Sequence, residues 1–333
     1  MRRDGSQVVH VRQSDAGQLL AALLRRLQPD ATAASAAQLL RNRRVQIDGN
    51  LCQDGQRRLK VGEVVKILPH AIAAPPTADD IRVHFVDEHL VIVEKPSGLT
   101  TMRHAEEAQW TGRRQRREST LDDLLPGLLT KSANSARGRP KHSARPPRVI
   151  PVHRLDRETS GLMVFARTTT AERSLVTQFR EHSIDRAYLA IVSGEIAAQT
   201  MESHLARDRG DGKRGSVADP QAGQHAVTHV RPVEVIHDFT LVECRLETGR
   251  THQIRIHLSE AQHPVCGDKE YRGPLGQKPM LDSSGAPRLA LHAAELGFEH
   301  PLTGETMHFE TRLPRDLSDL LRRLRRSTAE ARG

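Results

Sequence analysis

The chain has 333 residues, and its 50 lysines and arginines exceed its 41 aspartates and glutamates by a formal net charge of +9. A basic excess of this kind favours a polyanionic partner, nucleic acid first and an anionic membrane surface second. The chain has no apolar run of the roughly 20 residues that a spanning helix needs, and residues 1–10 lack the apolar stretch of a signal sequence. We therefore expect a cytoplasmic protein that does not enter a membrane.

Cysteine and aromatic content narrow the class of protein further. Cys52, Cys244 and Cys266 are far apart, so they form neither a disulfide framework nor a zinc-binding pair. Aromatic residues make up 3% of the chain, which favours recognition of a nucleic acid by charge and shape over recognition by many stacked bases. The length predicts two domains, one large and one small.

Residues 8–70 have the pattern of a small α+β domain. A first helix is predicted by leucines at helical spacing, namely Leu19, Leu20, Leu23, Leu24 and Leu27. A second helix is predicted to open at Ser35, which forms a capping-box pattern with Gln38. Short strands are predicted over residues 45–47 and 64–68.

Three arginines gather at the end of the second predicted helix and in the turn after it, namely Arg41, Arg43 and Arg44. Such residues often form a solvated basic face, but beside a hairpin in a basic chain they are also candidates for RNA contact. Residues 35–68, through SAAQLLRNRRVQIDGN and LKVGEVVKIL, resemble the S-four RNA-binding fold. The resemblance implies that this domain presents basic residues to structured RNA.

The rest of the chain is predicted to form one large domain. A proline-containing linker over residues 71–79 precedes it. The domain itself is expected over residues 80–320 and starts with two apolar strands, and a basic tail follows over residues 321–333.

Residues 103–148 interrupt this domain with a strongly basic segment. It contains eleven lysines and arginines against five aspartates and glutamates, and we expect most of it to be mobile. The exception is residues 120–129, whose leucines predict a short docked helix that is interrupted at Pro126-Gly127. The segment is either a plain insertion or a source of sequence-independent affinity for phosphates.

Residues 153–161 read HRLDRETSG and lead directly into an apolar, strand-like run over residues 162–166. Asp156 stands between Arg154 and Arg157 at the start of that run. On charge pattern alone this carboxylate is either half of a weak surface ion pair or an ionised group held in place for chemistry. The remaining segments of the chain favour the second interpretation.

A tyrosine lies in the strand predicted over residues 185–194. Packing in a strand interior explains Tyr188 by residue type alone, although the only other tyrosine in the chain is Tyr271. A phenol beside a carboxylate also passes protons.

Residues 251–258, THQIRIHL, are predicted to form a helix. Arg255 then shares one side of the helix with His252, whereas Leu258 lies on the apolar side. His252 and His257 fall on different faces with no cysteine or glutamate nearby to complete a ligand set, so we expect no metal site here.

Seven segments occur in the order typical of the RluA-type pseudouridine synthases, namely EKPSGL, TLDDLL, HRLDRETSGLMVFA, RAYLAIVSG, LETGRTHQIRIHL, HPVCGDKEY and LHAAELGFEHPLTG. The resemblance covers residues 80–310, and HRLDRETSG combined with GRTHQIR is highly specific. Many members of that family carry an S-four-like domain ahead of the catalytic one. The resemblance implies an α+β fold with a central mixed, mainly antiparallel sheet flanked by helices, preceded by a small α+β domain.

The resemblance also implies the reaction, in which a uridine in RNA is flipped out of the stack, its uracil is detached from the ribose, turned and rejoined through carbon 5. Asp156 matches the essential aspartate, whose role as nucleophile or as base at the ribose 2′ carbon stays open. Tyr188 matches the residue that packs under the uracil and helps to remove the carbon-5 proton. Arg255 matches the arginine that pairs with the aspartate and keeps it ionised.

Six further residues of these motifs are candidates for substrate binding, namely His153, Arg154, Thr159, Arg250, His252 and Leu258. Arg154 either fills the gap that the flipped base leaves or only buttresses its loop. After Leu99 the usual short loop of the family is replaced by residues 100–103 and the basic insertion. Substrate choice is therefore the property that the resemblance transfers least.

The implied reaction neither oxidises nor consumes energy, so we expect no cofactor and no metal. The expected partner is RNA, with large-subunit (23S) ribosomal RNA first and transfer RNA second, and the expected oligomeric state is a monomer. A non-catalytic RNA-binding assembly factor is the alternative from another class, and the trio Asp156, Tyr188 and Arg255 argues against it. A metal-dependent phosphoesterase rests on the 18 histidines alone.

Overall fold

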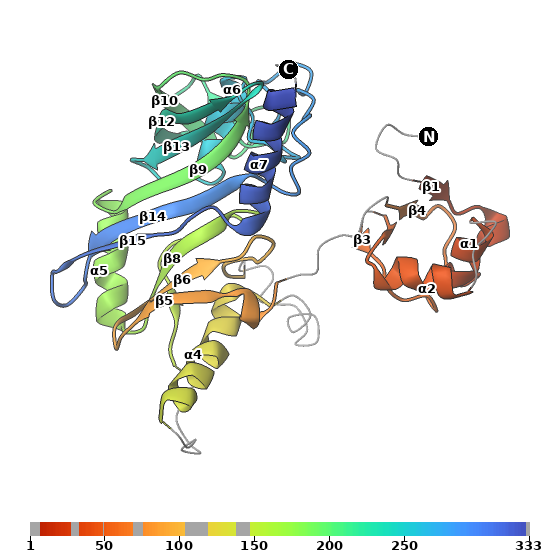
Figure 1. Ribbon diagram of the computed structural model, residues 1–333, viewed down its shortest axis with the longest axis horizontal. Helices are drawn as coiled ribbons and strands as arrows, with labels where there is room; N and C mark the ends of the chain where they lie inside the picture. The colour runs from red at the N-terminus through yellow and green to blue at the C-terminus, as the bar shows by residue number, and fades with distance from the viewer. Residues whose placement is uncertain are drawn as a thin grey trace. The chain divides into compact units, whose positions relative to one another are not determined.

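In the computed structural model the chain forms two compact units, Met1–Pro75 and Pro76–Gly333 (Figure 1). The described residues are 7–27, 33–48, 50–68, 76–103, 119–137 and 147–330. Most of the linker expected at 71–79 and of the insertion expected at 103–148 lies outside them. The described end of the linker forms a short 3-10 helix, Ala78–Asp80.

In the first unit, two helices pack against a four-stranded antiparallel sheet of order β1-β4-β2-β3. The elements are β1 Gln7–His10, α1 Leu20–Arg26, α2 Ala33–Arg41, β2 Val45–Ile47, β3 Asn50–Leu51 and β4 Val64–Ile67. Leu20, Leu23 and Leu24 of α1 are fully buried against Val45 and Val65 of the sheet. The leucine spacing of α1 thus forms one apolar stripe that faces the strands.

Two local features of this unit differ from the expectation. Helix α2 begins at Ala33, so Ser35 lies inside the helix and is not its N-cap. The alanines around Ser35 explain the earlier start, because alanine has the highest helix propensity. Strand β1 has no alternating pattern and was not predicted; its backbone pairs with β4 over its full length.

In the second unit, eleven strands form one sheet whose main order is β11-β10-β12-β13-β9-β14-β8-β6-β5. Among the described strands, β8 and β14 pair in parallel and the other neighbours are antiparallel. This confirms the predicted mixed, mainly antiparallel sheet. The strands are β5 Arg82–Val86, β6 Leu90–Lys95, β7 Ile150–Pro151, β8 Ser160–Ala166, β9 Asp185–Ser193, β10 Gln199–Ala206, β11 Gly215–Val217, β12 Gln224–Ile236, β13 Phe239–Leu246, β14 Leu291–Glu299 and β15 Thr306–Glu310.

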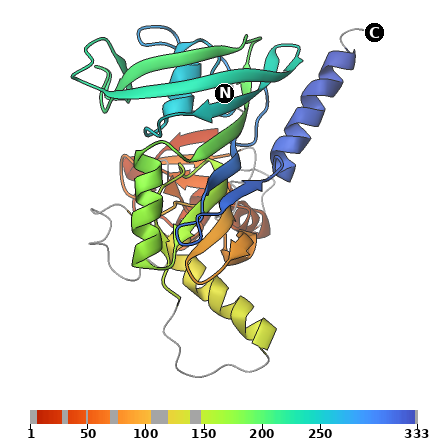
Figure 2. The ribbon, with the colours of Figure 1, turned by 90° about the vertical axis from the view of Figure 1, so that its left-hand side faces the viewer.

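Helices cover both faces of the sheet around β8, which is buried along its whole length (Figure 2). The helices are α4 Leu121–Arg137, α5 Thr169–Arg180, α6 Gln253–Glu260 and α7 Arg315–Glu330. Met163 and Phe165 of β8 pack with the leucines of α4, whereas Leu162 and Val164 point to the other face and pack with Leu175 of α5. Because successive strand residues alternate between faces, the continuous apolar run of β8 packs against the helices on both faces of the sheet.

Helix α4 continues through Pro126, so the interruption predicted there is wrong. Proline in a helix removes one backbone hydrogen bond and costs about 3 kcal/mol. Leu121, Leu125 and Leu129 are buried on the domain core, and full burial of each contributes about 1.5–3 kcal/mol. The docking of one helix face therefore outweighs the cost of the proline.

Helix α7 crosses residue 320, where the sequence placed the start of a separate basic tail. Leu317, Leu320, Leu321 and Leu324 repeat at helical spacing and are buried in the cluster that contains β9 and β13. The arginines between them lie on the other side of the same helix, so their charge masked an amphipathic pattern. None of the described helices is long and apolar enough to cross a membrane.

Strands β8 and β14 approach each other closely at Gly161, which pairs with Ala293 in their parallel ladder. Gly161 has a φ of 124°, and a Cβ on it would lie 2.2 Å from the Ala293 carbonyl oxygen. A side chain here would meet rigid backbone, not a movable side chain. Gly161 therefore sets the separation of two central strands immediately after the HRLDRETS loop.

We predict that Gly161→Ala lowers the free energy of unfolding by about 3 kcal/mol or more, because it adds backbone strain and overpacking. Gly127→Ala is the matched control. Gly127 lies in α4, and a Cβ on it would meet no atom within 4 Å, so alanine there is expected to stabilise by about 0.5–1 kcal/mol. Urea denaturation of the two variants measures both effects, and a Gly161→Ala protein as stable as wild type would refute the first.

Candidate active site

The segment between β7 and β8 forms a tight loop that carries Asp156. The Thr159 N–H donates to the Asp156 carbonyl at 3.1 Å. The Thr101 hydroxyl donates to the Leu155 carbonyl at 3.0 Å and accepts from the Leu155 N–H at 3.2 Å. Asp156 is therefore attached to a fixed backbone and not to a free surface turn.

Lys95, at the end of β6, ties the same loop to the sheet. Its Nζ donates to three backbone carbonyl groups, those of Pro96, Leu99 and Arg157, at 3.0, 2.8 and 3.1 Å. The side chain is fully buried. Burial lowers the pKa of Lys95 to about 7, while the carboxylates of Asp156 and Glu158 act in the opposite direction. The three carbonyls match the three N–H groups of the charged form.

Asp156 faces two side chains from the region of α6. Its Oδ2 lies 3.4 Å from Nη1 of Arg255, and its Oδ1 lies 3.7 Å from Nε2 of His252. The Asp156 side chain retains 18% of its exposure. A carboxylate in this position is both held by a cation and reachable from solvent.

Arg255 is anchored mainly by another aspartate, Asp268, which the sequence motifs did not single out. Arg255 Nε donates to Asp268 Oδ2 at 2.7 Å and Nη2 donates to Oδ1 at 3.0 Å, while Nη2 also lies 3.4 Å from Glu270 Oε2. Burial opposes the charge of Arg255, but the hydrogen bonds to Asp268 and the carboxylates of Asp156 and Glu270 raise its pKa above the ordinary value. The guanidinium is therefore a permanent cation with a fixed orientation.

Asp268 is itself completely buried on its side chain. Its Oδ1 also accepts the backbone N–H groups of Glu270 and Tyr271 at 2.8 and 3.0 Å. The Tyr271 ring lies under the guanidinium of Arg255, with its centroid 4.9 Å from Cζ. The HPVCGDKEY segment thus builds the socket that holds Arg255.

His252 links this socket to Asp156. It is the N-cap of α6 with a left-handed φ of 60°, and its Nδ1 lies 2.8 Å from the Tyr271 hydroxyl. Burial lowers the pKa of His252, against the opposing influence of the Asp156 carboxylate. The imidazole is therefore neutral at pH 7, with one nitrogen bonded to Tyr271 and the other turned to Asp156.

The start of α6 is fixed by Gln253. Its side-chain oxygen accepts from the Thr248 hydroxyl at 2.7 Å and from the Arg250 N–H at 2.9 Å. Its amide nitrogen donates to the Val227 carbonyl and the Thr228 hydroxyl, each at 2.9 Å. Gln253 therefore locks the GRTHQIR turn to β12 and determines where Arg255 points.

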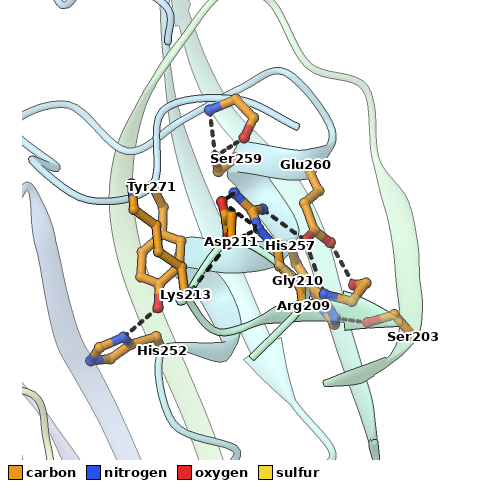
Figure 3. Close-up of polar contacts among 12 residues, drawn as sticks. Ser203, Arg209, Gly210, Asp211, Lys213, His252, His257, Ser259, Glu260 and Tyr271 are labelled. Atoms are coloured by element: carbon orange, nitrogen blue, oxygen red, sulfur yellow. Dashed lines mark hydrogen bonds and ion pairs between the residues drawn. The ribbon is translucent and has the colours of Figure 1, made fainter. Parts of the chain in front are cut away.

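The far end of α6 is fixed by a second polar group (Figure 3). Glu260 accepts from the Ser216 N–H at 3.0 Å and from Arg209 Nη1 at 3.4 Å, and Arg209 is also paired with Asp211 at 3.1 Å. Both ends of this eight-residue helix are thus tied to the sheet.

Tyr188, in β9, lines the same pocket as Asp156. The pocket has a volume of about 410 Å³, which lies within the roughly 300–1,000 Å³ of small-ligand sites. Burial raises the pKa of Tyr188 above its ordinary value, so the ring is a neutral phenol at pH 7. In the described part of the chain its hydroxyl makes no hydrogen bond, which leaves it available to a ligand.

Of the six predicted substrate-binding residues, five line this pocket, namely His153, Arg154, Thr159, Arg250 and His252. Burial lowers the pKa of His153 to about 3, and its Nε2 accepts the Val164 N–H at 3.0 Å. The hydroxyl of buried Thr159 has no hydrogen-bond partner among the described residues. Arg250 Nε donates to a backbone carbonyl, that of His225, at 3.0 Å, and Arg154 is exposed.

Leu258 does not line the pocket, so the expectation for this residue is wrong. It is fully buried in the core cluster beneath α6, because the apolar side of that helix packs on the sheet.

His257 is a core histidine whose two nitrogens lie 2.9 Å from the Thr228 and Ser203 hydroxyls, and burial lowers its pKa to about 4. The described residues contain no cluster of three or more potential metal ligands.

The arginines predicted to bind RNA in the first unit differ in how many contacts their side chains make within that unit. Arg41 is exposed at the end of α2. Arg43 has a left-handed φ of 55° and reaches Gln53 Oε1 at 3.3 Å. Arg44 Nε donates to the Leu68 carbonyl at 2.7 Å, so part of its hydrogen-bonding capacity is already used next to β4.

Comparison with known proteins agrees with this fold. Residues 89–260 match the RNA pseudouridylate synthase family. Ribosomal large subunit pseudouridine synthase D of Neisseria meningitidis serogroup A is 35% identical over 320 residues, 93% of this chain and 79% of the relative. The protein of the same name from Xanthomonas campestris pv. campestris is 34% identical over 328 residues, 96% of this chain and 92% of the relative.

A solved structure also resembles the chain. Human RNA Pseudouridylate Synthase Domain Containing 4 has a TM-score of 0.55 at 27% identity, and the match covers 73% of this chain and 93% of that chain. Asp156, Tyr188 and Arg255 all fall inside the segment that matches the family. We conclude that the chain belongs to the RNA pseudouridylate synthase family and is an isomerase.

Proposed function

We propose that this isomerase acts on large-subunit ribosomal RNA and that Asp156 is its essential catalytic residue. The single observation that carries the second part is the position of Asp156, fixed by its loop and lying 3.4 Å from Arg255 in an open pocket. The names of the bacterial relatives support the choice of RNA.

In this proposal Asp156 acts as an anion. The permanent cation of Arg255 lies 3.4 Å from its Oδ2, and Nε2 of His252 lies 3.7 Å from its Oδ1. An ionised carboxylate at this position attacks the uridine or removes the proton at the ribose 2′ carbon, and either role requires the same fixed anion. The two roles differ in the covalent intermediate and not in the geometry.

Tyr188 supplies the surface for the uracil. A neutral phenol is a weak base, so we propose that the ring packs against the uracil and that the hydroxyl relays the carbon-5 proton, accepting it while it releases its own proton to solvent water. For the uracil to reach Tyr188 it must leave the RNA stack, at a cost of a few kcal/mol. Exposed Arg154, on the rim of the pocket, is suited to fill the gap.

We propose that the first unit adds affinity for RNA that does not depend on the pocket. Exposed Arg41 is its best-placed phosphate contact, and Arg43 lies in the adjoining turn. A cation on a solvated face binds phosphate through counterion release, so its contribution falls as salt rises.

Replacing Asp156 by asparagine is predicted to abolish pseudouridine formation while RNA binding changes little, because an amide is neither a nucleophile nor a base. Tritium release from [5-³H]uridine-labelled transcripts of 23S ribosomal RNA and of transfer RNA measures the reaction. Exposed Asp79, remote in sequence from the loop, provides the control Asp79→Asn. Retained activity in Asp156→Asn would overturn the catalytic assignment, and release from transfer RNA alone would overturn only the choice of RNA.

Asp268→Asn is predicted to lower kcat/KM by about 100-fold, because Arg255 loses its bidentate acceptor and misplacement of about 1 Å costs that much. Asp282→Asn is the control, since Asp282 accepts the Gly267 N–H at 2.7 Å in the neighbouring loop but does not contact Arg255. Kinetics and thermal melting of both variants separate the roles. Equal losses of activity at equal stability would show that Asp268 acts only as a loop anchor.

Lys95 gives a prediction for the pH dependence of stability. Its pKa of about 7 in the fold lies below the lysine value in the unfolded chain, so the unfolded state binds more protons between about pH 7 and 10. The free energy of unfolding of wild type should therefore rise with pH relative to Lys95→Met, by at most about 1.4 kcal/mol per pH unit.

Denaturation of both proteins at pH 7, 8 and 9 measures this difference. Lys269 is exposed, and wild type and Lys269→Met should keep a constant difference over the same range. A constant difference for Lys95→Met as well would contradict the lowered pKa.

A further inference from the structure

Arg186 is a cation in the wall of the substrate pocket that the proposed chemistry does not use. It lies on β9 two residues before Tyr188, and because strand residues i and i+2 share a face, both side chains point to the same side. Arg186 and Tyr188 both line the 410 Å³ pocket. Strand geometry separates their backbones by roughly 6.7 Å.

Rings and backbone hold the guanidinium of Arg186 in place. Its Cζ lies 5.6 Å from the centroid of the Phe179 ring, and that ring in turn stacks on His153 with a centroid distance of 4.6 Å. A Cβ on Gly249 would lie 2.6 Å from Nη1 of Arg186, so the glycine makes room for the guanidinium. Stacking orients the cation without using its N–H donors.

Most hydrogen-bonding capacity of Arg186 is unused in the described part of the chain. Nη2 donates to the Glu247 carbonyl at the long distance of 3.4 Å, and Nε is buried without a partner. No described carboxylate lies within 4 Å of it, in contrast to Arg255, Arg245 and Arg209, which each pair with at least two.

A cation in this state is unfavourable for the free protein. Burial lowers the pKa of Arg186 below the ordinary arginine value, and a desolvated charge without a counter-ion costs free energy. His153 is neutral at pH 7 and adds no second positive charge beside Arg186. The cost is recovered when an anion enters the pocket.

We propose that Arg186 binds a backbone phosphate of the RNA next to the flipped uridine. A planar guanidinium with free donors is the side chain best matched to a phosphodiester. The spacing between Arg186 and Tyr188 fits a phosphate that lies next to the uracil along the RNA chain. Besides Arg255, three more arginines line the same pocket, namely Arg154, Arg180 and Arg250, so the backbone would follow a cationic path.

This inference rests on the proposed function, because it takes RNA as the occupant. The alternative occupant of the same donors is a carbonyl oxygen of the uracil itself. A phosphate contact releases a counterion and changes the salt dependence of binding, whereas a contact to a neutral base does not. Salt dependence therefore separates the two.

The experiment measures binding of an unmodified 23S ribosomal RNA transcript by proteins that all carry Asp156→Asn, so that turnover does not interfere. Adding Arg186→Gln is expected to weaken binding roughly tenfold and to reduce the slope of log K against log salt by about 0.7 to 0.9. Arg186→Lys keeps the charge, so its slope should stay close to that of the parent while its affinity falls less. Arg173→Gln, an exposed arginine of α5 outside the pocket, should match the parent.

A second measurement excludes a merely structural role. Because Arg186 carries a half-buried charge with no described carboxylate as counter-ion, Arg186→Gln is expected to melt at the same temperature as the parent or above it. A lower melting temperature with a parallel loss of binding would overturn the proposal. An unchanged salt slope would also overturn it, in favour of contact with the base.

Failure of the phosphate site and failure of the proposed function give different results. Wild type that binds the transcript but releases no tritium from it would refute the substrate or the chemistry, while the binding series would still report on Arg186. A protein series with equal affinities and equal slopes, together with normal tritium release by wild type, would refute the phosphate site alone.

Discussion

The proposed active site depends on the bidentate bond between Arg255 and Asp268. The two residues come from neighbouring segments, and Asp156 comes from a loop 99 residues earlier in the chain, so the sheet must bring the loop and α6 together. Asp268 takes two of the guanidinium donors at 2.7 and 3.0 Å and thereby aims the remaining edge at Asp156, 3.4 Å away. If the fork turned, Asp156 would lose both its counter-charge and its orientation.

Two opposite solutions for a buried charge therefore lie near Asp156. The charge of Arg255 is neutralised by carboxylates, which raises its pKa and makes it a rigid part of the protein. Lys95 is satisfied by three carbonyl dipoles, and burial lowers its pKa to about 7. Arg255 thus contacts Asp156 from the side of α6, while Lys95 holds the backbone of the Asp156 loop at the end of β6.

The sequence predicts the residues that face the pocket better than it predicts the residues that hold them in place. Asp156, Tyr188 and Arg255 belong to recognisable segments, and the structure brings them to one pocket. Asp268 was missed because an aspartate in a loop shows no period, and its bond to Arg255 depends on tertiary packing. Leu258 was misassigned because motif membership does not separate the pocket side of a helix from its core side. In the fold, the sequence places a basic tail from residue 321, inside α7, because the arginines there hide four leucines at helical spacing. The predicted interruption at Pro126 is wrong because packing of α4 outweighs one lost hydrogen bond.

Arg255 and Arg186 differ in whether carboxylates of the protein itself pair with the guanidinium group. Both guanidinium groups lie against an aromatic ring. Arg255 has carboxylate partners and belongs to the finished architecture, whereas Arg186, in the pocket wall, leaves most of its donors unused among the described residues. Selection for stability alone favours an apolar side chain at such a position. In our proposal, the anionic backbone that a flipped uridine carries with it is the partner of this cation next to Tyr188.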